Sequence, residues 1–222
     1  MTPINAKLLI FDLDGTLADT ISAITDGMNL ALDECGLPRR SVDHVRRSLG
    51  DGARMLCRRM LPPELFNDDA LTDCLLETYN RTYGLTYMNT RENYTGISET
   101  VRELKRRGYI LAVLSNKQDV YVKNMISSLF PEGEFSLSFG NTPERHRKPD
   151  PAGAIELCRA LGISPEDAVM IGDGETDVRA AQNAGFAANV TVTWGYRPID
   201  LLRSCGADIF VDRPEELLEL FQ

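Results

Sequence analysis

Two aspartates one residue apart, Asp12 and Asp14, directly follow a continuous apolar run and precede Gly15 and Thr16. A carboxylate that attacks phosphorus forms a covalent intermediate, and a second carboxyl group can act first as an acid and then as a base. We predict that Asp12 is the nucleophile and that Asp14 protonates the leaving alkoxide and later activates water. Gly15 and Thr16 are expected to turn the backbone so that amide N–H groups face a phosphate. Taken alone, this segment could also be an ordinary capped turn.

A second acidic segment contains Asp173 and, one helical turn later, Asp177. Asp173 is expected to bind a metal ion beside Asp12, with the backbone carbonyl of Asp14 as a further ligand. Asp177 could face the same ion or orient its waters, although an acid favoured by the dipole at a helix N-terminus is the competing interpretation. Oxygen ligands of this kind favour Mg²⁺, and the chain has no cluster of histidines or cysteines for zinc.

Six short apolar runs predict buried strands, and helical patterns lie between most of them. Strands that alternate with helices predict parallel βαβ units, and so an α/β fold with a Rossmann-like sheet. The third run, 135–139, alternates in character and suits a strand near the edge. The predicted strands are 8–11, 110–114, 135–139, 168–171, 188–192 and 209–211.

One stretch, from about residue 20 to residue 87, has helical patterns and no convincing strand. The predicted helices are 21–35, 41–49 with Ser41 as N-cap, 53–61 and 70–83. This is much more chain than a crossover needs, so we predict an inserted helical domain. The expected domains are residues 1–17 plus 92–222 for the α/β part and residues 18–91 for the helical insertion.

Two further polar segments, Ser115-Asn116-Lys117 and the segment that begins at Lys148, also lie at predicted strand ends or before a helix. Ligands of open α/β sheets bind at the carboxyl ends of the strands. The order and strand context of all four segments resemble the haloacid dehalogenase-like hydrolase superfamily, and the insertion resembles its type 1 cap. The resemblance implies that Ser115 and Asn116 bind phosphate and that Lys148 balances charge at the nucleophile. Lys117 is the main rival for that role.

Within the superfamily the chain looks most like the phosphoglycolate phosphatases, on the segments 12–20, 50–53, 194–197 and 206–208. This implies a phosphoric monoester hydrolase acting on a small anionic ester such as 2-phosphoglycolate. Five arginines flank the break at Gly50, and we select Arg54 as the candidate for a substrate carboxylate. In Gly174 the chain departs from the more common Ser, Thr or Asn of the family.

Alternative functions remain open. Related β-phosphoglucomutases carry a histidine where this chain has Ile24, which makes a sugar-phosphate mutase the second choice. A pyrophosphatase shares all four segments, and a non-catalytic binding or regulatory protein could use the same scaffold. Carbon-attacking dehalogenases lack the aspartate found at Asp14, and phosphonate hydrolases need a cap lysine. No lysine occurs between Lys7 and Lys105.

Composition limits the classes of partner. The formal net charge of −9 disfavours nucleic acid, and no apolar run approaches a membrane span. Five scattered cysteines match no zinc pattern and indicate reduced thiols. We therefore expect a cytoplasmic enzyme with a small phosphorylated metabolite as partner, present as a monomer or homodimer.

Overall fold

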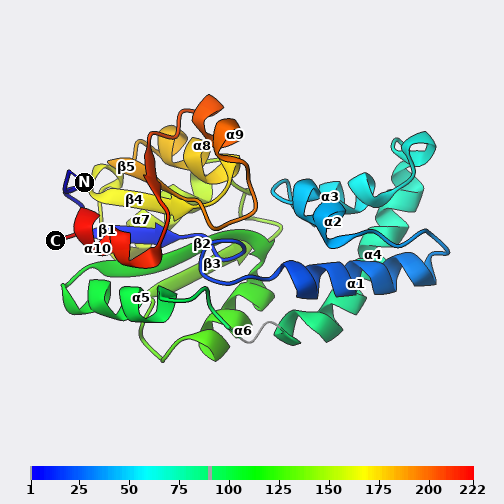
Figure 1. The fold of residues 1–222 in the computed structure, drawn as a ribbon, viewed down its shortest axis with the longest axis horizontal. Helices are drawn as coiled ribbons and strands as arrows, with labels where there is room; N and C mark the ends of the chain where they lie inside the picture. The colour runs from blue at the N-terminus through cyan, green and yellow to red at the C-terminus, as the bar shows by residue number, and fades with distance from the viewer. Residues whose placement is uncertain (1, 90–91) are drawn as a thin grey trace. The chain divides into compact units, whose positions relative to one another are not determined.

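The computed structural model of the protein describes residues 2–89 and 92–222. Its sheet has six parallel strands in the order β3-β2-β1-β4-β5-β6 (Figure 1). The bounds are β1 Leu8–Phe11, β2 Ile110–Gln118, β3 Leu137–Asn141, β4 Ala168–Gly172, β5 Ala188–Val192 and β6 Ile209–Val211. The predicted α/β class is confirmed, and β3, whose sequence indicated an edge strand, lies at the edge.

The centre of the sheet is buried on both faces, which explains why β1 is apolar at every position. All four residues of β1 are inaccessible to solvent. Leu8 and Ile10 pack with residues of β2, β4, α7 (Ala152–Leu161) and α8 (Glu175–Ala184). On the other face Phe11 meets Phe135 edge to face, with 6.0 Å between the ring centroids. Because both faces of this strand are covered, the side chains on both faces are buried away from water. Its sequence is therefore an unbroken apolar run.

Helices cover the sheet on both sides. In Figure 1, α7 and α8 lie on one side of the strands and α5 and α6 on the other. Further short helices follow β5 and β6 and complete this part of the chain. The bounds are α5 Ile97–Arg106, α6 Asp119–Leu129, α9 Ile199–Ser204 and α10 Leu217–Leu220, with 3₁₀ turns at Pro165–Asp167 and Pro214–Glu216.

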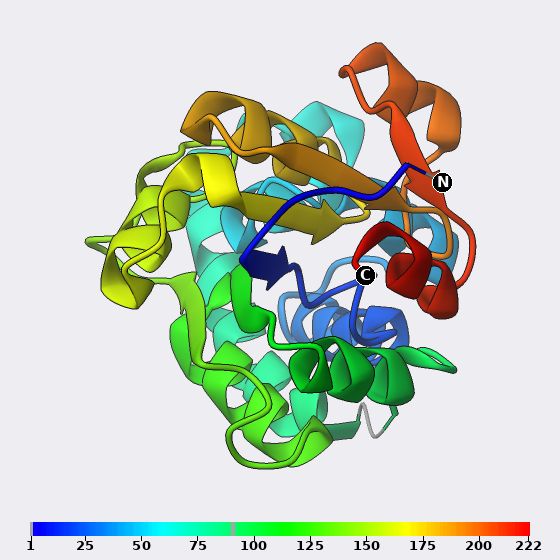
Figure 2. The same cartoon turned by 90° about the vertical axis from the view of Figure 1, so that its left-hand side faces the viewer.

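The two ends of the sheet differ in what they carry. Both chain termini lie at the amino ends of the strands, where the Ile4 N–H donates to the Leu220 carbonyl oxygen at 2.9 Å (Figure 2). Three of the polar segments singled out above lie at the carboxyl ends of strands: Asp12 follows β1, residues 115–117 lie in the last part of β2, and Asp173 follows β4. Parallel strands therefore gather these distant segments at one edge of the sheet.

Strand β2 is longer than predicted. We expected it to end at Leu114, but it continues to Gln118, and its pairing with β3 shifts between Leu114 and Gln118. Over this interval, residues 115–117 of β2 lie opposite the single residue Gly140 of β3. Such a bulge bends a strand and re-aims its side chains. The bulge therefore sets the directions of Ser115, Asn116 and Lys117.

Residues 20–91 form a separate compact unit, and residues 1–19 and 92–222 form the other. The first boundary lies two residues beyond the predicted one, because Ala18 bridges Asn93 and the Leu17 carbonyl accepts from the Tyr94 N–H. The second predicted boundary lies between residues 91 and 92, and residues 90 and 91 lie outside the described residues. The helical unit contains α1 Ile21–Glu34, α2 Val42–Ser48, α3 Ala53–Met60 and α4 Asp69–Thr86, with 3₁₀ turns at Pro63–Leu65 and Tyr87–Asn89.

Close packing and caps hold the helical unit together. The Thr82 hydroxyl of α4 donates to the Gly27 carbonyl of α1 at 2.7 Å, and a side chain at Gly27 would collide with Thr86. Ser41 caps α2 as predicted, with its hydroxyl accepting from the His44 N–H. Among the described helices of both units, none has the length and apolar character needed to span a membrane.

Candidate active site

Asp12 lies immediately beyond β1 and is held by backbone hydrogen bonds and by an ion pair. Its N–H donates to the Ile171 carbonyl at 2.9 Å, which extends the β1–β4 ladder by one residue. Its carboxylate accepts from the Leu13 N–H at 2.7 Å and pairs with Lys148 Nζ at 3.0 Å. The side chain is 14% exposed, so it keeps access to solvent while its ammonium partner is buried.

Lys148 is the buried cation of the site. Its Nζ pairs with Asp12 and, at 2.6 Å, with Asp177. The backbone of Lys148 is held by the Asn116 amide, which accepts from its N–H at 2.8 Å and donates to its carbonyl at 2.9 Å. The structure thus places Lys148 beside Asp12, the predicted nucleophile, and a role of Lys148 in catalysis stays a prediction.

Three carboxylates gather around this lysine. Oxygen atoms of Asp12, Asp173 and Asp177 lie within 4.8 Å of one another. Asp173 accepts from the Tyr196 N–H at 2.7 Å and from the Thr16 hydroxyl at 3.4 Å. One ammonium group faces three acids, so the cluster carries an excess of negative charge that a divalent cation would neutralise. These oxygen donors fit Mg²⁺.

Burial perturbs the titration of the cluster. It raises the pKa of Asp12 to about 6, an effect that the positive charge of Lys148 partly offsets. Burial also raises the pKa of Asp173 well above its usual range, and the nearby charges of Asp12 and Asp177 raise it further. For Lys148, burial acts to lower the pKa, but the two carboxylates outweigh it and raise the pKa.

Asp177 has a structural role and also belongs to the cluster. One of its oxygens pairs with Lys148, and the other accepts from the Gly174 N–H at 2.9 Å, which caps α8. A side chain at Gly172 would overlap the Asp177 carboxylate, because its Cβ would lie 2.3 Å from the Asp177 Cγ. Asp177 therefore caps α8 and also lies in the acidic cluster, and its contact with a metal ion stays a prediction.

Asp14 lies apart from these acids. Its carboxylate pairs with Lys117 Nζ at 2.7 and 2.9 Å, and the side chain is 21% exposed. The side chain of Asp14 is not a member of the acidic cluster found among the described residues. Lys148 pairs with Asp12 and Asp177 and Lys117 pairs with Asp14, so Lys148 is better placed than Lys117 for the predicted role at Asp12. A metal contact through the Asp14 carbonyl stays a prediction.

Comparison with known proteins agrees with this geometry. Residues 9–190 match the family model described as haloacid dehalogenase-like hydrolase. The chain belongs to this family. Phosphoglycolate phosphatase 1 of Pseudomonas aeruginosa is 34% identical over 203 residues, which cover 87% of this chain and 72% of that protein. Phosphoglycolate phosphatase of Aquifex aeolicus is 30% identical, and the match covers 96% of both chains. The hydrolase is accordingly a phosphoric monoester hydrolase.

Solved structures support the same assignment of fold. A predicted phosphoglycolate phosphatase from Haemophilus somnus has a TM-score of 0.85 and 30% identity, covering 98% of this chain and 99% of that chain. CbbY from Rhodobacter sphaeroides, solved with xylulose-(1,5)bisphosphate, has a TM-score of 0.74 at 21% identity, covers 98% of this chain and 100% of that chain, and shows the shared fold alone.

Within the hydrolase, Gly15 and Thr16 have partners inside their own turn. The Gly15 N–H donates to the Ala18 carbonyl at 3.0 Å, and the Thr16 N–H donates to the Leu13 carbonyl at 3.3 Å. Gly15 has φ +83°, a conformation that favours glycine. The turn itself uses both of these donors, and substrate binding by Gly15 and Thr16 stays a prediction. The two residues shape the turn between Asp12 and Asp19.

Ser115 and Asn116 lie on the bulge of β2. The Ser115 hydroxyl accepts from the Lys117 N–H at 3.3 Å, and the side chain is buried. The Asn116 amide is engaged with the backbone of Lys148, so its contribution is to hold the lysine loop rather than to present that amide to a substrate. Phosphate binding by Ser115 stays a prediction.

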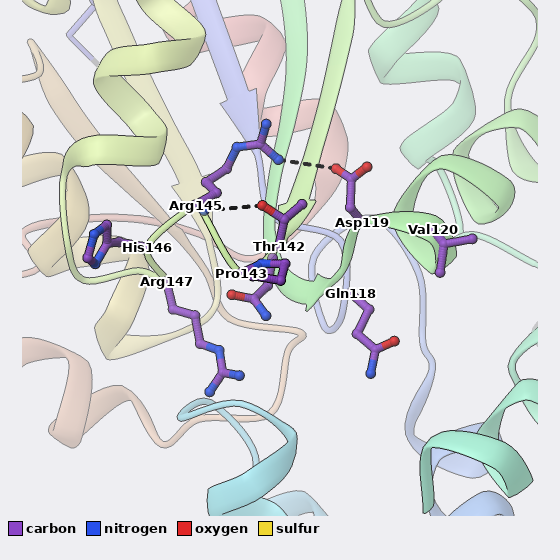
Figure 3. Close-up of a pocket in the computed structure, with 9 residues that line it drawn as sticks. Gln118, Asp119, Val120, Thr142, Pro143, Arg145, His146 and Arg147 are labelled. Carbon is purple, nitrogen blue, oxygen red and sulfur yellow. Dashed lines mark hydrogen bonds and ion pairs between the residues drawn. The ribbon is translucent and has the colours of Figure 1, made fainter. Parts of the chain in front are cut away.

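The loop before Lys148 is anchored beside a groove of about 750 Å³ at the ends of β2 and β3 (Figure 3). Arg145 pairs with Asp119 at 3.2 Å, and its backbone N–H donates to the Thr142 hydroxyl at 3.1 Å. Its guanidinium also lies 3.9 Å from the centroid of the Phe139 ring. Arg145 therefore fixes the path of the loop that leads to Lys148.

In the helical unit, Arg54 is engaged by two acids of α4. Its guanidinium pairs with Asp69 at 2.9 Å and with Asp73 at 2.7 Å. Arg58 also pairs with Asp69, and Arg59 pairs with Asp51 at 2.5 Å. A substrate contact of Arg54 stays a prediction, and it would require exchange of these partners.

Sequence reasoning missed the contribution of the segment after β5. Residues 194–197 were used only as a subfamily signature, yet the Tyr196 N–H bonds Asp173 and the Trp194 indole N–H donates to the Thr16 carbonyl at 3.1 Å. The sequence offers one signal of a close contact here, the small residue Gly195 between two aromatic residues. This signal does not indicate that the contact is with Asp173.

Proposed function

We propose that the hydrolase cleaves 2-phosphoglycolate with Mg²⁺ and through an aspartyl-phosphate on Asp12. The observation that carries the proposal is the separation of Asp12 and Asp14 into two lysine pairs. Lys148 pairs with Asp12, which belongs to the acidic cluster, while Lys117 pairs with Asp14, which does not belong to it among the described residues. Two carboxylates in different surroundings can take different roles in one reaction.

The first half of the reaction transfers the phosphoryl group to the enzyme. An Asp12 oxygen attacks phosphorus, the bond from phosphorus to the ester oxygen breaks, and Asp14 gives its proton to the departing alkoxide. Glycolate leaves as the alcohol. Lys148 orients Asp12 and offsets the negative charge that gathers there.

The second half releases phosphate. Asp14, now a carboxylate, takes a proton from water as the oxygen attacks phosphorus, and the bond to Asp12 breaks. Both carboxyl groups return to their starting states. Asp12, Asp173 and Asp177 would hold Mg²⁺, which supplies positive charge to the phosphoryl oxygens when bound.

The choice of 2-phosphoglycolate rests on the relatives from Pseudomonas aeruginosa and Aquifex aeolicus, both named phosphoglycolate phosphatases. We place the enzyme in the cytoplasm, where free thiols such as the buried Cys57 and Cys158 persist, as a monomer or homodimer.

The test is a panel of substrates at equal concentration with and without Mg²⁺. We expect kcat/KM for 2-phosphoglycolate to exceed that for ethyl phosphate, which lacks the carboxylate, by tenfold or more. Preference for a sugar phosphate or pyrophosphate would replace the proposed substrate. Conversion of β-glucose 1-phosphate without release of phosphate would indicate a mutase, an alternative that the buried apolar Ile24 does not favour.

The enzymatic proposal has its own control. p-Nitrophenyl phosphate needs no recognition of the leaving group, so its turnover tests the phosphoryl-transfer machinery alone. Absence of turnover with Mg²⁺ would favour a non-catalytic binding protein on this scaffold.

A further inference from the structure

The segment after β5, here called the 194–197 loop, consists of Trp194, Gly195, Tyr196 and Arg197. It begins two residues after the last residue of β5 and contacts segments near the start of the chain and near Asp173. None of its four residues belongs to the acidic cluster found among the described residues. Its contacts nevertheless converge on one member of that cluster.

Asp173 lies between two glycines that come from opposite parts of the chain. A Cβ at Gly195 would lie 2.2 Å from the Asp173 Cβ and 2.4 Å from its Oδ2. A Cβ at Gly15 would lie 2.4 Å from the same oxygen. Real Cβ atoms do not approach other atoms so closely, so any side chain at either position must displace Asp173. The Tyr196 N–H then fixes Oδ2 at 2.7 Å.

Three further contacts fix the 194–197 loop itself. The Trp194 indole donates to the Thr16 carbonyl at 3.1 Å, and the Tyr196 hydroxyl donates to Asp19 at 3.1 Å. Arg197 pairs with Glu175 at 3.0 Å, two residues after Asp173, and its side chain is 9% exposed. The loop is thus tied both to the Asp12 segment and to the segment that carries Asp173.

We propose that the 194–197 loop is a positioning element for the carboxylate of Asp173, with Gly195 and Trp194 as positioning residues that set the affinity for Mg²⁺. The inference rests on the proposed use of Mg²⁺. A metal site requires its ligand oxygens within a few tenths of an ångström of their places, and groups that orient a ligand commonly change affinity about 10- to 100-fold.

The decisive variant is Gly195→Ala. Its methyl group must push the Asp173 side chain or the loop aside. We therefore expect at least a tenfold rise in the Mg²⁺ concentration that gives half of the maximal increase in melting temperature. The value of kcat at saturating Mg²⁺ should fall much less, because Asp12, Asp14 and Lys148 are untouched. A purely structural role would lower the melting temperature without this selective change in metal dependence.

The binding of Mg²⁺ is measured without enzymatic activity. Mg²⁺ is added to the full chain without substrate, and the melting temperature is followed against Mg²⁺ concentration, since a ligand of the native state stabilises it by mass action. Trp194 is the single tryptophan of the chain, so its fluorescence emission reports on the 194–197 loop itself. Asp173→Asn should remove the response.

Gly153→Ala is the matched control. Gly153 lies in α7, where a Cβ would meet its nearest neighbours at 3.4 Å, so a methyl group is accommodated there. This variant should respond to Mg²⁺ as the wild type does. Trp194→Phe keeps an aromatic ring but loses the donor to Thr16, and we expect a rise of a few-fold in half-saturation by melting temperature. If Gly195→Ala does not fold, Trp194→Phe alone tests whether the 194–197 loop positions Asp173.

The outcomes separate the two proposals. A wild type that shows no Mg²⁺ response in stability or activity overturns both. A wild type that responds, with folded Gly195→Ala and Trp194→Phe responding at the same Mg²⁺ concentration, overturns the positioning role alone and leaves the proposed function standing.

Discussion

In the α/β unit, Lys148 and Asp177 form an ion pair whose side chains are 2% and 1% exposed, whereas the paired side chains of Arg54 and Asp73 in the helical unit are 40% and 59% exposed. Loss of one partner from a buried pair leaves an uncompensated charge away from water. Loss of one partner from an exposed pair leaves a charge that water solvates. Removing one residue of an ion pair should therefore reduce stability much more in the α/β unit than in the helical unit.

The largest effect is expected for Asp12→Asn. The amide is nearly isosteric but cannot attack phosphorus, so kcat should fall by about 10⁴-fold or more. Steady-state hydrolysis of p-nitrophenyl phosphate measures this, with circular dichroism to verify folding. Asp33→Asn, which alters an exposed pair with Arg39, is the control and should retain activity. Full activity in Asp12→Asn would remove the nucleophile assignment.

Replacement of each lysine in turn tests the contrast between buried and partly exposed carboxylates. Lys148→Met leaves Asp12 and Asp177 without their cation, and we expect a loss of about 3–5 kcal/mol in the free energy of unfolding without Mg²⁺. Activity should fall by about 10²- to 10³-fold. Urea unfolding and kcat/KM measure the two effects.

Lys117→Met is the matched variant. Its partner Asp14 is 21% exposed and reaches water, so the loss of stability and of activity should both be smaller. A larger effect in Lys117→Met than in Lys148→Met would reverse the assignment of the two lysines to the two aspartates.

The Mg²⁺ dependence should change with pH in a defined direction. The pKa of Asp12 is raised to about 6 by burial, so as pH falls through about 6 the carboxyl group takes up a proton and the cluster loses a metal ligand. The pKa of Asp12 is higher in the folded than in the unfolded protein. The metal-free protein therefore loses stability as the pH rises from about 4 to about 6 and Asp12 becomes ionised in its buried position. The gain in melting temperature on adding Mg²⁺ should therefore grow from about pH 5 to about pH 7.5. A gain that stays constant or shrinks over this range would contradict the assignment of Asp12 as a ligand.

The smallest effect is expected in the helical unit. Arg54→Gln removes two exposed ion pairs and should change the melting temperature little. If Arg54 reaches the substrate carboxylate, KM for 2-phosphoglycolate should rise a few-fold while the kinetics with ethyl phosphate stay unchanged. Equal kinetics of variant and wild type on both substrates would remove Arg54 from the substrate site. Arg39→Gln, another exposed arginine of this unit, is the control.

The amino-acid sequence is enough to predict the parallel sheet and the edge at which its polar segments meet. Buried parallel strands must be apolar on both faces, so β1 appears as an unbroken run that ends at Asp12. The carboxyl ends of such strands meet at one edge of the sheet, which makes Asp12 and Asp173 neighbours before any coordinates are known. Local signals also placed Ser41 at the start of α2.

The partners of these residues depend on tertiary packing, which the sequence does not reveal. The choice between Lys117 and Lys148 depends on the bulge in β2 and on the Asn116 amide that holds the lysine loop. The N–H groups of Gly15 and Thr16 bond within their own turn, which the motif does not indicate. The contacts of Gly195 with Asp173 join two loops that are separated in the sequence by α8 and β5. Spacing along a chain limits where a side chain can lie, but contacts between loops depend on the packing that brings those loops together.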